Sequence, residues 1–478
     1  MHQDTEQCLR AVQAKDARFD GWFFTAVLTT GIYCRPSCPA VPPKPKNIVF
    51  HPTAASAQAA GFRACKRCRP DASPGSPEWD VRGDVVARAM RLIADGVVDR
   101  DGVPGLAARL GYSRRQLERM LLAELGAGPL GLARAQRAQT ARLLIETTGL
   151  GFADVAFAAG FGSVRQFNDT VREVFATTPG ELRAKAKPGE PAKGAVTVRL
   201  PFRQPLFPDN LFGHLVATGV PGVEEWADGA YRRTLRLPHG HGVVALAPTP
   251  EHIRCTLQLQ DMRDLAAAIA RCRSLLDLDA DPVAIDAQLS RDPVLEPLVR
   301  KASGRRVPRT VDGDELAIRA VLGQQVSTAA GRTLAARLVT AFGDPIEDSS
   351  LTHLFPTAEQ LVDAGGHLAM PAARRDTVLR LARALAEGDV DLAPGVDRDV
   401  ARQQLSALKG IGPWTVETVA MRALGDPDAF LPTDLGIAQA LKGLGAVDTE
   451  LWRPWRAYAV QHLWALGDHP INRMPGES

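Results

Sequence analysis

Two closely spaced pairs of cysteines place the tightest constraint on how this chain of 478 residues can fold. Cys34 and Cys38 are separated by three residues, Cys65 and Cys68 by two, and 26 residues lie between the pairs. Short spacing within each pair lets two thiolates reach one ion, and the long connection brings the second pair around. A segment of about 70 residues has little core of its own, so a metal would supply much of its folding energy. We therefore expect one Zn²⁺ at these four cysteines, either purely structural or also reactive.

The beginning of the chain argues against disulfide bonds as the alternative use of these cysteines. The segment MHQDTEQCLR carries two acidic residues and no apolar stretch typical of a secretion signal. No run of about 18 apolar residues is present, so we expect no membrane-spanning helix and no membrane partner. We therefore expect a cytoplasmic protein, in which disulfides are rare. The remaining cysteines, Cys8, Cys255 and Cys272, are scattered and are expected to be ordinary core or surface residues.

Composition and hydrophobic periodicity divide the chain into four expected domains. Two Pro- and Gly-containing linkers, 73–79 and 184–194, flank a segment with apolar residues at helical spacing. Strand-like alternation follows from about 195 to 260, and helical periodicity then continues to the end. The expected domains are 1–75, 81–183, 195–300 and 301–478. Residues 1–187 hold 26 Lys and Arg against 18 Asp and Glu, a net charge of +8, whereas the remainder has −5. A basic front half weakly favours a polyanionic partner.

The segment 81–183 contains two patterns typical of helix-turn-helix units. In the second, a helix over 153–159 ends at Gly160, and Ser163 caps a helix that runs to about Phe175. In the first, Gly111 marks the turn and Ser113 the cap. Polar residues follow each cap, namely Arg114, Arg115 and Gln116 in the first unit and Arg165, Gln166 and Asn168 in the second. A plain helical bundle is the alternative interpretation.

Two further patterns lie in the C-terminal part. LKGIGPWTVETVAM, residues 408–421, is a helix–hairpin–helix signature, in which Gly410 and Gly412 allow a tight hairpin whose backbone N–H groups can face a phosphate. FLPTDLGI, residues 430–437, follows about 20 residues later. Taken alone, Asp434 in this string would be a helix N-cap, because a helical pattern follows it.

The strings TTGIYCRPSCPA and GFRACKRCRPD closely resemble the N-terminal domain of the Ada adaptive-response proteins. The resemblance implies that Cys34 takes a methyl group irreversibly from a DNA methylphosphotriester. Zinc keeps such a sulfur ionised at neutral pH while it remains a nucleophile. Nearby cations would contact the phosphate backbone, namely Arg35, Arg63, Lys66, Arg67 and Arg69.

The helical middle resembles the AraC-type DNA-binding domain, which places two recognition helices in successive major grooves. FGSVRQFNDTVREVFATTP matches that family along its whole length. The resemblance makes several residues plausible base or phosphate contacts, namely Arg114, Arg115, Ser163, Arg165, Gln166 and Asn168.

Residues 195–470 resemble the AlkA-type 3-methyladenine DNA glycosylases of the HhH-GPD superfamily. Three strings carry this resemblance: the hairpin string 408–421, FLPTDLGI at 430–437 and AIRAVLGQQVS at 317–327. The resemblance makes Asp434 the catalytic carboxylate, which stabilises oxocarbenium character at the sugar. Trp414 and Trp464 would stack on a flipped base. Trp414 stands where bifunctional relatives carry a catalytic lysine, so no lyase activity is expected. No cysteine follows Cys272, so no iron–sulfur cluster is expected.

The sequence also departs from these families. Thr418 and Leu435 replace pocket tyrosines, and Gln325 stands where the enzyme inserts a leucine into the duplex. The alkylguanine methyltransferase half of long Ada proteins is absent, so repair of O6-alkylguanine is not expected.

Together these features predict a multidomain, mainly α chain. We expect a small zinc-bound α/β Ada-type module, an AraC-type double helix-turn-helix, an α+β AlkA N-terminal-like domain and an all-α helix–hairpin–helix glycosylase domain. The predicted function is alkylation-damage repair and its regulation. It comprises methyl transfer to Cys34, methylation-stimulated binding to promoter DNA, and excision of bases such as 3-methyladenine. Expected partners are double-stranded DNA, both alkylated and promoter operator, with RNA polymerase as a further possibility. The alternative is a zinc-containing DNA-binding regulator whose glycosylase half is inactive.

Overall fold

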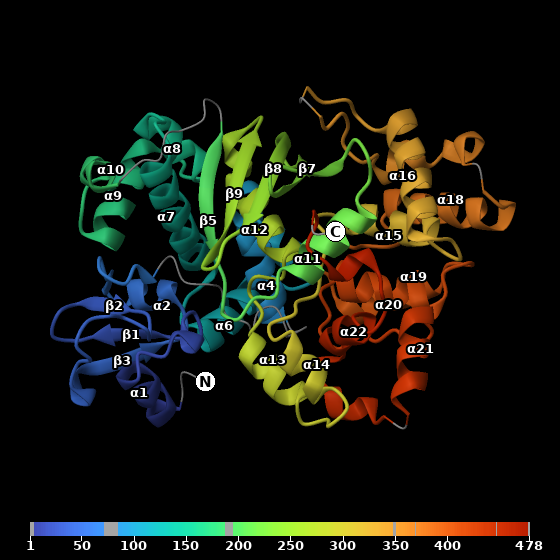
Figure 1. Cartoon of the computed structure of the whole chain (residues 1–478). Helices are drawn as coiled ribbons and strands as arrows, with labels where there is room; N and C mark the ends of the chain where they lie inside the picture. Colours follow the sequence, from blue (N-terminus) through green and yellow to red (C-terminus); the bar gives the residue numbers. More distant parts are fainter. Residues whose placement is uncertain are drawn as a thin grey trace. The chain divides into compact units, whose positions relative to one another are not determined.

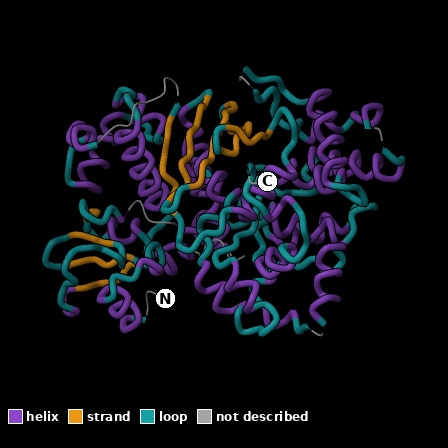
Figure 2. The backbone as a smooth tube through the Cα atoms, viewed as in Figure 1, coloured by secondary structure: helices purple, strands orange, loops and turns teal. Residues whose placement is uncertain are grey.

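A computed structural model describes residues 4–70, 85–186, 195–347, 350–368, 370–445 and 447–476. The predicted linker 73–79 and residues 187–194 of the second linker lie outside these ranges. The chain divides into two compact units: one contains residues 1–203, 237–242 and 251–270, the other 204–236, 243–250 and 271–478. Helices dominate, and the strands form two separate sheets (Figures 1 and 2). Within the described ranges, none of the helices combines the length and the apolar character needed to cross a membrane.

The cysteine-rich N-terminal segment forms a small α/β module, as predicted. Its four strands are β1 (Phe24–Val27), β2 (Ile32–Cys34), β3 (Ile48–His51) and β4 (Arg63–Ala64), in the order β3-β1-β2-β4. β1 pairs antiparallel with β2 and β3, whereas β2 and β4 are parallel. Helices α1 (Thr5–Gln13) and α2 (Ala54–Ala59) accompany the sheet, and the buried residues Cys8, Ala11, Val12 and Phe23 form a small core cluster. Such a cluster is small for a domain, consistent with a need for metal.

Seven helices lie within the described residues 85–186 and include both predicted helix-turn-helix units. The helices are α4 (Val85–Ala94), α5 (Val97–Leu110), α6 (Arg114–Leu125), α7 (Pro129–Thr147), α8 (Phe152–Ala158), α9 (Val164–Phe175) and α10 (Pro179–Lys185). Gly111 and Gly160 adopt left-handed φ angles of +75° and +84° at the two turns. Ser113 and Ser163 cap α6 and α9 by accepting from the N–H groups of Gln116 and Gln166. The predicted turn and cap residues of both units are therefore confirmed, with α8 starting and ending one residue earlier than expected.

A five-stranded sheet follows, in the order β5-β9-β8-β7-β6. Its strands are β5 (Val196–Pro201), β6 (Glu224–Ala227), β7 (Ala230–Leu237), β8 (Gly240–Pro248) and β9 (His252–Leu259). The alternation in the sequence predicted four of these strands but missed β6 and the helix α11 (Asp209–Thr218). Helices α12 (Leu265–Leu275), α13 (Pro282–Leu289) and α14 (Glu296–Lys301) come next.

The C-terminal part is helical, as predicted. Its helices are α15 (Gly313–Leu322), α16 (Thr328–Phe342), α17 (Ala358–Leu361), α18 (Ala372–Ala386), α19 (Arg398–Ser406), α20 (Pro413–Arg422), α21 (Leu435–Leu444) and α22 (Arg456–Trp464). They enclose a large core that includes Ile318, Leu338, Leu381, Val419 and Trp452.

The predicted hairpin connects α19 to α20, and its two glycines have different roles. Gly410 has a φ of +96°, and a Cβ there would lie 2.1 Å from Thr377 Oγ1. The fold therefore requires glycine at this position. Gly412 is the N-cap of α20 with an ordinary φ of −96°, and a Cβ there would meet nothing within 4 Å in the described part of the chain. Because Gly412 has no side chain, another molecule can closely approach the backbone at the start of α20.

We predict that Gly410→Ala destabilises the C-terminal unit, whereas Gly412→Ala does not. The left-handed backbone and the clash with Thr377 should lower the free energy of unfolding by about 1–3 kcal/mol. Thermal melting of the two full-length variants measures the difference. Equal melting temperatures for both variants would contradict this account of the hairpin.

Candidate functional site

The four clustered cysteines meet at one edge of the N-terminal sheet. The parallel pairing of β2 with β4 sets Ile32 opposite Arg63 and Tyr33 opposite Ala64. Cys34 and Cys65 come next along the two strands, so the pairing delivers them to the same end of the sheet. The sulfur atoms of Cys34, Cys38, Cys65 and Cys68 all lie within 4.8 Å of one another. Four thiolates around Zn²⁺ at about 2.3 Å would be separated by about 3.8 Å, so the cluster fits a tetrahedral ion.

The ionisation of these thiols also suits a cation. Burial raises the pKa of the Cys38 thiol to about 11. A hydrogen bond from Cys34 lowers the pKa of Cys68 to about 6. The metal-free thiols therefore share protons unequally, and a divalent cation would replace those protons and hold the sulfurs as thiolates. Cys65 and Cys68 are buried, whereas Cys34 and Cys38 are partly exposed.

A buried carboxylate, which the sequence gave no reason to select, fixes the first cysteine loop. Asp20 is 4% exposed and accepts hydrogen bonds from the backbone N–H of Ser37, at 3.0 Å, and its hydroxyl, at 2.6 Å. Its carboxylate also lies 3.4 Å from Arg35 Nη1. Arg35, expected to contact phosphate, is thus engaged in an ion pair inside the module.

The other cations near the cysteines divide into two groups. Lys66 donates to the carbonyl of Ala176 at the end of α9, at 3.1 Å, and Arg69 pairs with Glu146 of α7. These contacts tie the second cysteine loop to the helical segment rather than leaving both side chains free for DNA. Arg67 is exposed, and Arg63 is partly buried.

The predicted contacts on the helix-turn-helix units lie at the exposed starts of α6 and α9. Arg114, Arg115, Ser163, Arg165 and Gln166 are exposed. Asn168 is half-buried and donates to the carbonyl of Val164, at 3.0 Å, so its amide is partly used within the helix. The opposite face of α9 packs its apolar side chains, including Phe167 and Val171, into the core. Each helix therefore presents a polar first turn to solvent.

In the C-terminal part, Asp434 accepts hydrogen bonds from three donors. Its Oδ1 accepts from the backbone N–H of Ile437, at 3.1 Å, and from Trp464 Nε1, at 3.0 Å. Its Oδ2 accepts from Trp414 Nε1, at 3.0 Å. The sequence left a helix cap and a reactive carboxylate as alternatives for Asp434, and the geometry makes it the cap of α21. The cap is compatible with reactivity, because Oδ2 accepts only one of these three bonds and keeps a lone pair available.

The two tryptophans come from different helices and point their N–H groups at the same carboxylate. Trp414 lies in the first turn of α20 and Trp464 at the end of α22, and both side chains are partly exposed. One ring covers Trp464 from α11: the imidazole of His214 stacks on it with a centroid distance of 6.1 Å and an interplanar angle of 29°. No sequence motif pointed to His214.

The remaining predicted residues of this part lie on the α15–α16 loop, within α20 and at the start of α21. Gln325, between α15 and α16, is exposed and has a left-handed φ of +55°. Its neighbour Gln324 donates to the carbonyl of Gly410, at 3.2 Å, which ties this loop to the hairpin. Thr418 is buried and donates its hydroxyl to the carbonyl of Trp414, at 2.7 Å, whereas Leu435 is 73% exposed.

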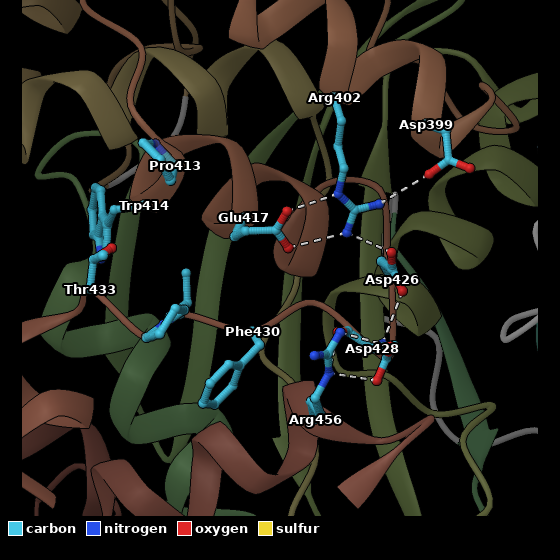
Figure 3. A pocket seen from close by; sticks show the side chains of 12 residues that line it. Asp399, Arg402, Pro413, Trp414, Glu417, Asp426, Asp428, Phe430, Thr433 and Arg456 are labelled. Carbon is cyan, nitrogen blue, oxygen red and sulfur yellow. Dashed lines mark hydrogen bonds and ion pairs between the residues drawn. The ribbon is translucent and has the colours of Figure 1, made fainter. Parts of the chain in front are cut away.

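A cavity of about 430 Å³ is lined by Trp414 and by residues of α19, α20, α22 and the 426–433 loop (Figure 3). Arg402 of α19 bridges Glu417 of α20, at 3.0 Å, and Asp426, at 2.6 Å. Arg456 pairs with Asp428, at 2.9 Å. These pairs fix the 426–433 loop that leads to Asp434. Asp434 is not among the lining residues, so we attribute to this cavity's walls a supporting role rather than a reactive one.

Comparison with known proteins agrees with this architecture. Three family descriptions match: "Metal binding domain of Ada" at 7–71, "Helix-turn-helix domain" at 106–185 and "AlkA N-terminal domain" at 197–312. The chain is 33% identical to the DNA-3-methyladenine glycosylase 2 of Escherichia coli, over 53% of this chain and 92% of that protein. It is 36% identical to the bifunctional transcriptional activator/DNA repair enzyme Ada of the same organism, over 29% of this chain and 37% of that protein.

A further relative matches along its whole length. The protein described as "Probable bifunctional transcriptional activator/DNA repair enzyme AlkA" from Mycobacterium tuberculosis is 61% identical over 99% of both chains. This degree of identity confirms the resemblances stated from the sequence to the Ada, AraC-type and AlkA families. The chain belongs to the family of bifunctional transcriptional activator/DNA repair enzymes called AlkA.

Proposed function

We propose that this chain senses alkylated DNA and repairs it. The zinc module takes a methyl group from a DNA methylphosphotriester, the helix-turn-helix module binds promoter DNA in the cytoplasm, and the C-terminal module excises alkylated bases. The observation that carries the excision activity is the carboxylate of Asp434, held by two indole N–H groups with Oδ2 left able to face a substrate.

Excision of a methylated purine needs little protonation of the leaving base by an acid catalyst. The methylated base is already cationic, so when the bond between C1′ and the base nitrogen breaks, the bonding electron pair neutralises the leaving base. Positive charge then develops at C1′, and the nearby Asp434 carboxylate stabilises it. Water adds to C1′, gives up a proton and leaves an abasic sugar. Trp414 occupies the start of α20 and offers no amine, so a Schiff-base step has no nucleophile there.

Methyl transfer in the zinc module is a displacement at carbon. The Cys34 sulfur attacks the methyl carbon, the bond from that carbon to the phosphotriester oxygen breaks, and the oxygen keeps the electron pair as a phosphodiester anion. Bound zinc would keep the sulfur ionised until it reacts. Exposure supports a methyl acceptor in the first cysteine pair, because Cys65 and Cys68 are buried. The family resemblance selects Cys34 within that pair.

The helix-turn-helix module supplies sequence-selective binding. The exposed polar first turns of α6 and α9 suit two contacts with the major groove of one duplex. We propose Arg114, Arg115, Arg165 and Gln166 as base or phosphate contacts, with exposed Arg67 adding a phosphate contact from the zinc module. An activator also needs the transcription machinery, so RNA polymerase is proposed as a second partner.

A regulator with an inactive glycosylase half is the competing proposal. It is favoured by the loss of pocket aromatics at Thr418 and Leu435. The arrangement of Asp434, Trp414 and Trp464 favours activity instead, because two indole N–H groups hold one carboxylate in a fixed orientation.

We predict one tightly bound Zn²⁺ per chain. Cys65→Ser should abolish tight zinc binding, because four thiolates are needed to close the site, and the module should then unfold. Cys272→Ala, which alters a buried cysteine of α12, is the matched control and should retain zinc. Metal analysis of the purified variants measures this, and undiminished zinc in Cys65→Ser would refute the four-cysteine site.

We predict that Asp434→Asn lowers base excision by at least about 100-fold while duplex binding is retained. Asparagine still caps a helix, so only the charge that stabilises the transition state is lost. Asp281→Asn, which alters the N-cap of α13, is the matched control and should excise normally. Release of methylated bases under single-turnover conditions measures the effect. Near-normal excision by Asp434→Asn would reject Asp434 as the reactive carboxylate.

We predict that methylation of Cys34 tightens binding to promoter DNA about tenfold at low salt. Four thiolates on Zn²⁺ give a formal charge of −2, and a thioether at Cys34 reduces it to −1. At about 5 Å and an effective dielectric of roughly 20, the removed repulsion from one phosphate is about 3 kcal/mol before salt screening. Screening would reduce it to about 1.4 kcal/mol, a factor of ten in affinity.

Titration of full-length protein, methylated and unmethylated, at two salt concentrations tests this switch. Wild-type protein exposed to unmethylated DNA is the control and should show no change in affinity. Equal affinities of the methylated and unmethylated protein at low salt would contradict the electrostatic explanation.

A further inference from the structure

The imidazole of His214 occupies a position next to the Asp434 site that the proposed excision chemistry does not use. It lies on α11, is 7% exposed, and stacks on Trp464, whose N–H donates to Asp434. His214 on α11 therefore contacts Trp464 at the end of α22, and Trp464 in turn contacts Asp434 at the start of α21.

The approach of α11 depends on a glycine beside the histidine. A Cβ on Gly213 would lie 2.3 Å from the carbonyl oxygen of Arg473 and 2.9 Å from that of Pro470. Without a side chain at this position, α11 packs directly against the backbone of the turn Pro470–Asn472. That turn also holds Trp464 from the other direction, because Asn472 Nδ2 donates to the Trp464 carbonyl, at 2.9 Å.

The surroundings of the stacked imidazole favour its neutral form. Burial lowers the pKa of His214 well below its usual range, and the nearby Arg422 and Arg319 lower it further. The stack is therefore a contact between two neutral rings, of the offset kind worth about 0.5–1.5 kcal/mol beyond the buried area. A neutral ring here also adds no positive charge beside a cationic substrate base.

Within the described residues, His214 Nε2 is buried without a hydrogen-bond partner. An unpaired buried nitrogen is costly, so a hydrogen bond from Nε2 does not account for the position of this ring. What its place provides is a surface against Trp464. The indole ring can turn away from Asp434 only by breaking both the stack and its hydrogen bond.

We propose that His214 is a positioning residue for base excision. Its ring fixes the plane of Trp464 so that the indole N–H donates a hydrogen bond to Asp434 Oδ1. This holds the carboxylate with Oδ2 directed at the sugar. With one face of Trp464 covered by His214, the opposite face is the one that a flipped base stacks on. The proposal rests on the proposed glycosylase function.

The test compares His214→Ala, which removes the ring, with His214→Phe, which restores an aromatic ring without nitrogens. His353→Ala, a substitution of a partly exposed histidine outside this series of contacts, is the control. The full-length proteins are assayed for single-turnover release of 3-methyladenine from methylated duplex DNA and for duplex affinity. The chain has seven tryptophans, so ¹⁵N-indole labelling gives a small set of NMR signals, and the Trp464 signal is assigned with Trp464→Phe.

We expect His214→Ala to excise at least tenfold more slowly, with duplex affinity unchanged and the Trp464 indole signal shifted towards its position in Asp434→Asn. His214→Phe should excise within about threefold of wild type, with the Trp464 signal restored, since a tenfold change corresponds to about 1.4 kcal/mol. Wild-type excision by His214→Ala would overturn the proposal, as would an unmoved Trp464 signal or a failure of His214→Phe to rescue. The NMR signal needs no activity, so an inactive wild type would instead refute the proposed function alone.

Discussion

The carboxylate of Asp434 receives N–H groups from two indoles, and much of the C-terminal architecture serves to bring those groups together. Trp414 arrives 20 residues earlier on α20 and Trp464 arrives 30 residues later on α22. The hairpin at Gly410 sets where α20 begins, and the ion pairs of Arg402 fix the loop that leads to Asp434. Three donors leave the carboxylate little rotational freedom, and such preorganisation is what the proposed stabilisation of a short-lived cation requires.

A different constraint organises the N-terminal module. Parallel pairing of two very short strands brings Cys34 and Cys65 to one edge, and Asp20 fixes the loop between Cys34 and Cys38 through Ser37. The sheet has only a small core, so we propose that metal binding and folding are coupled. The second cysteine loop contacts α9 and α7 through Lys66 and Arg69. The loop that carries two of the proposed metal ligands is thus attached to the helices that we propose bind the promoter.

Short-range patterns in the sequence predicted more of this structure than long-range ones. Cysteine spacing predicted that the four thiols cluster, and a glycine with a serine two or three residues later predicted both helix-turn-helix turns, because these features depend mainly on residues close in the sequence. The sequence left a helix cap and a reactive carboxylate as alternatives for Asp434. It could not show that Trp414 and Trp464 both donate to this carboxylate, because that depends on how distant helices pack. Helix α11 was missed because prolines precede it and strands surround it, and His214 was missed with it. Arg35, Lys66 and Arg69 carry ordinary surface charges in the sequence, and only the fold shows them paired within the protein.

Release of free methylated bases from methylated duplex DNA by the purified full-length chain tests the central claim most directly. The account predicts that 3-methyladenine appears in solution and that abasic sites appear in equal number, without strand cleavage, since Trp414 at the start of α20 offers no amine for lyase chemistry. Intact DNA after incubation with a protein that retains its zinc and still binds the duplex would contradict the account. The chain would then be a regulator that keeps a glycosylase fold without its chemistry.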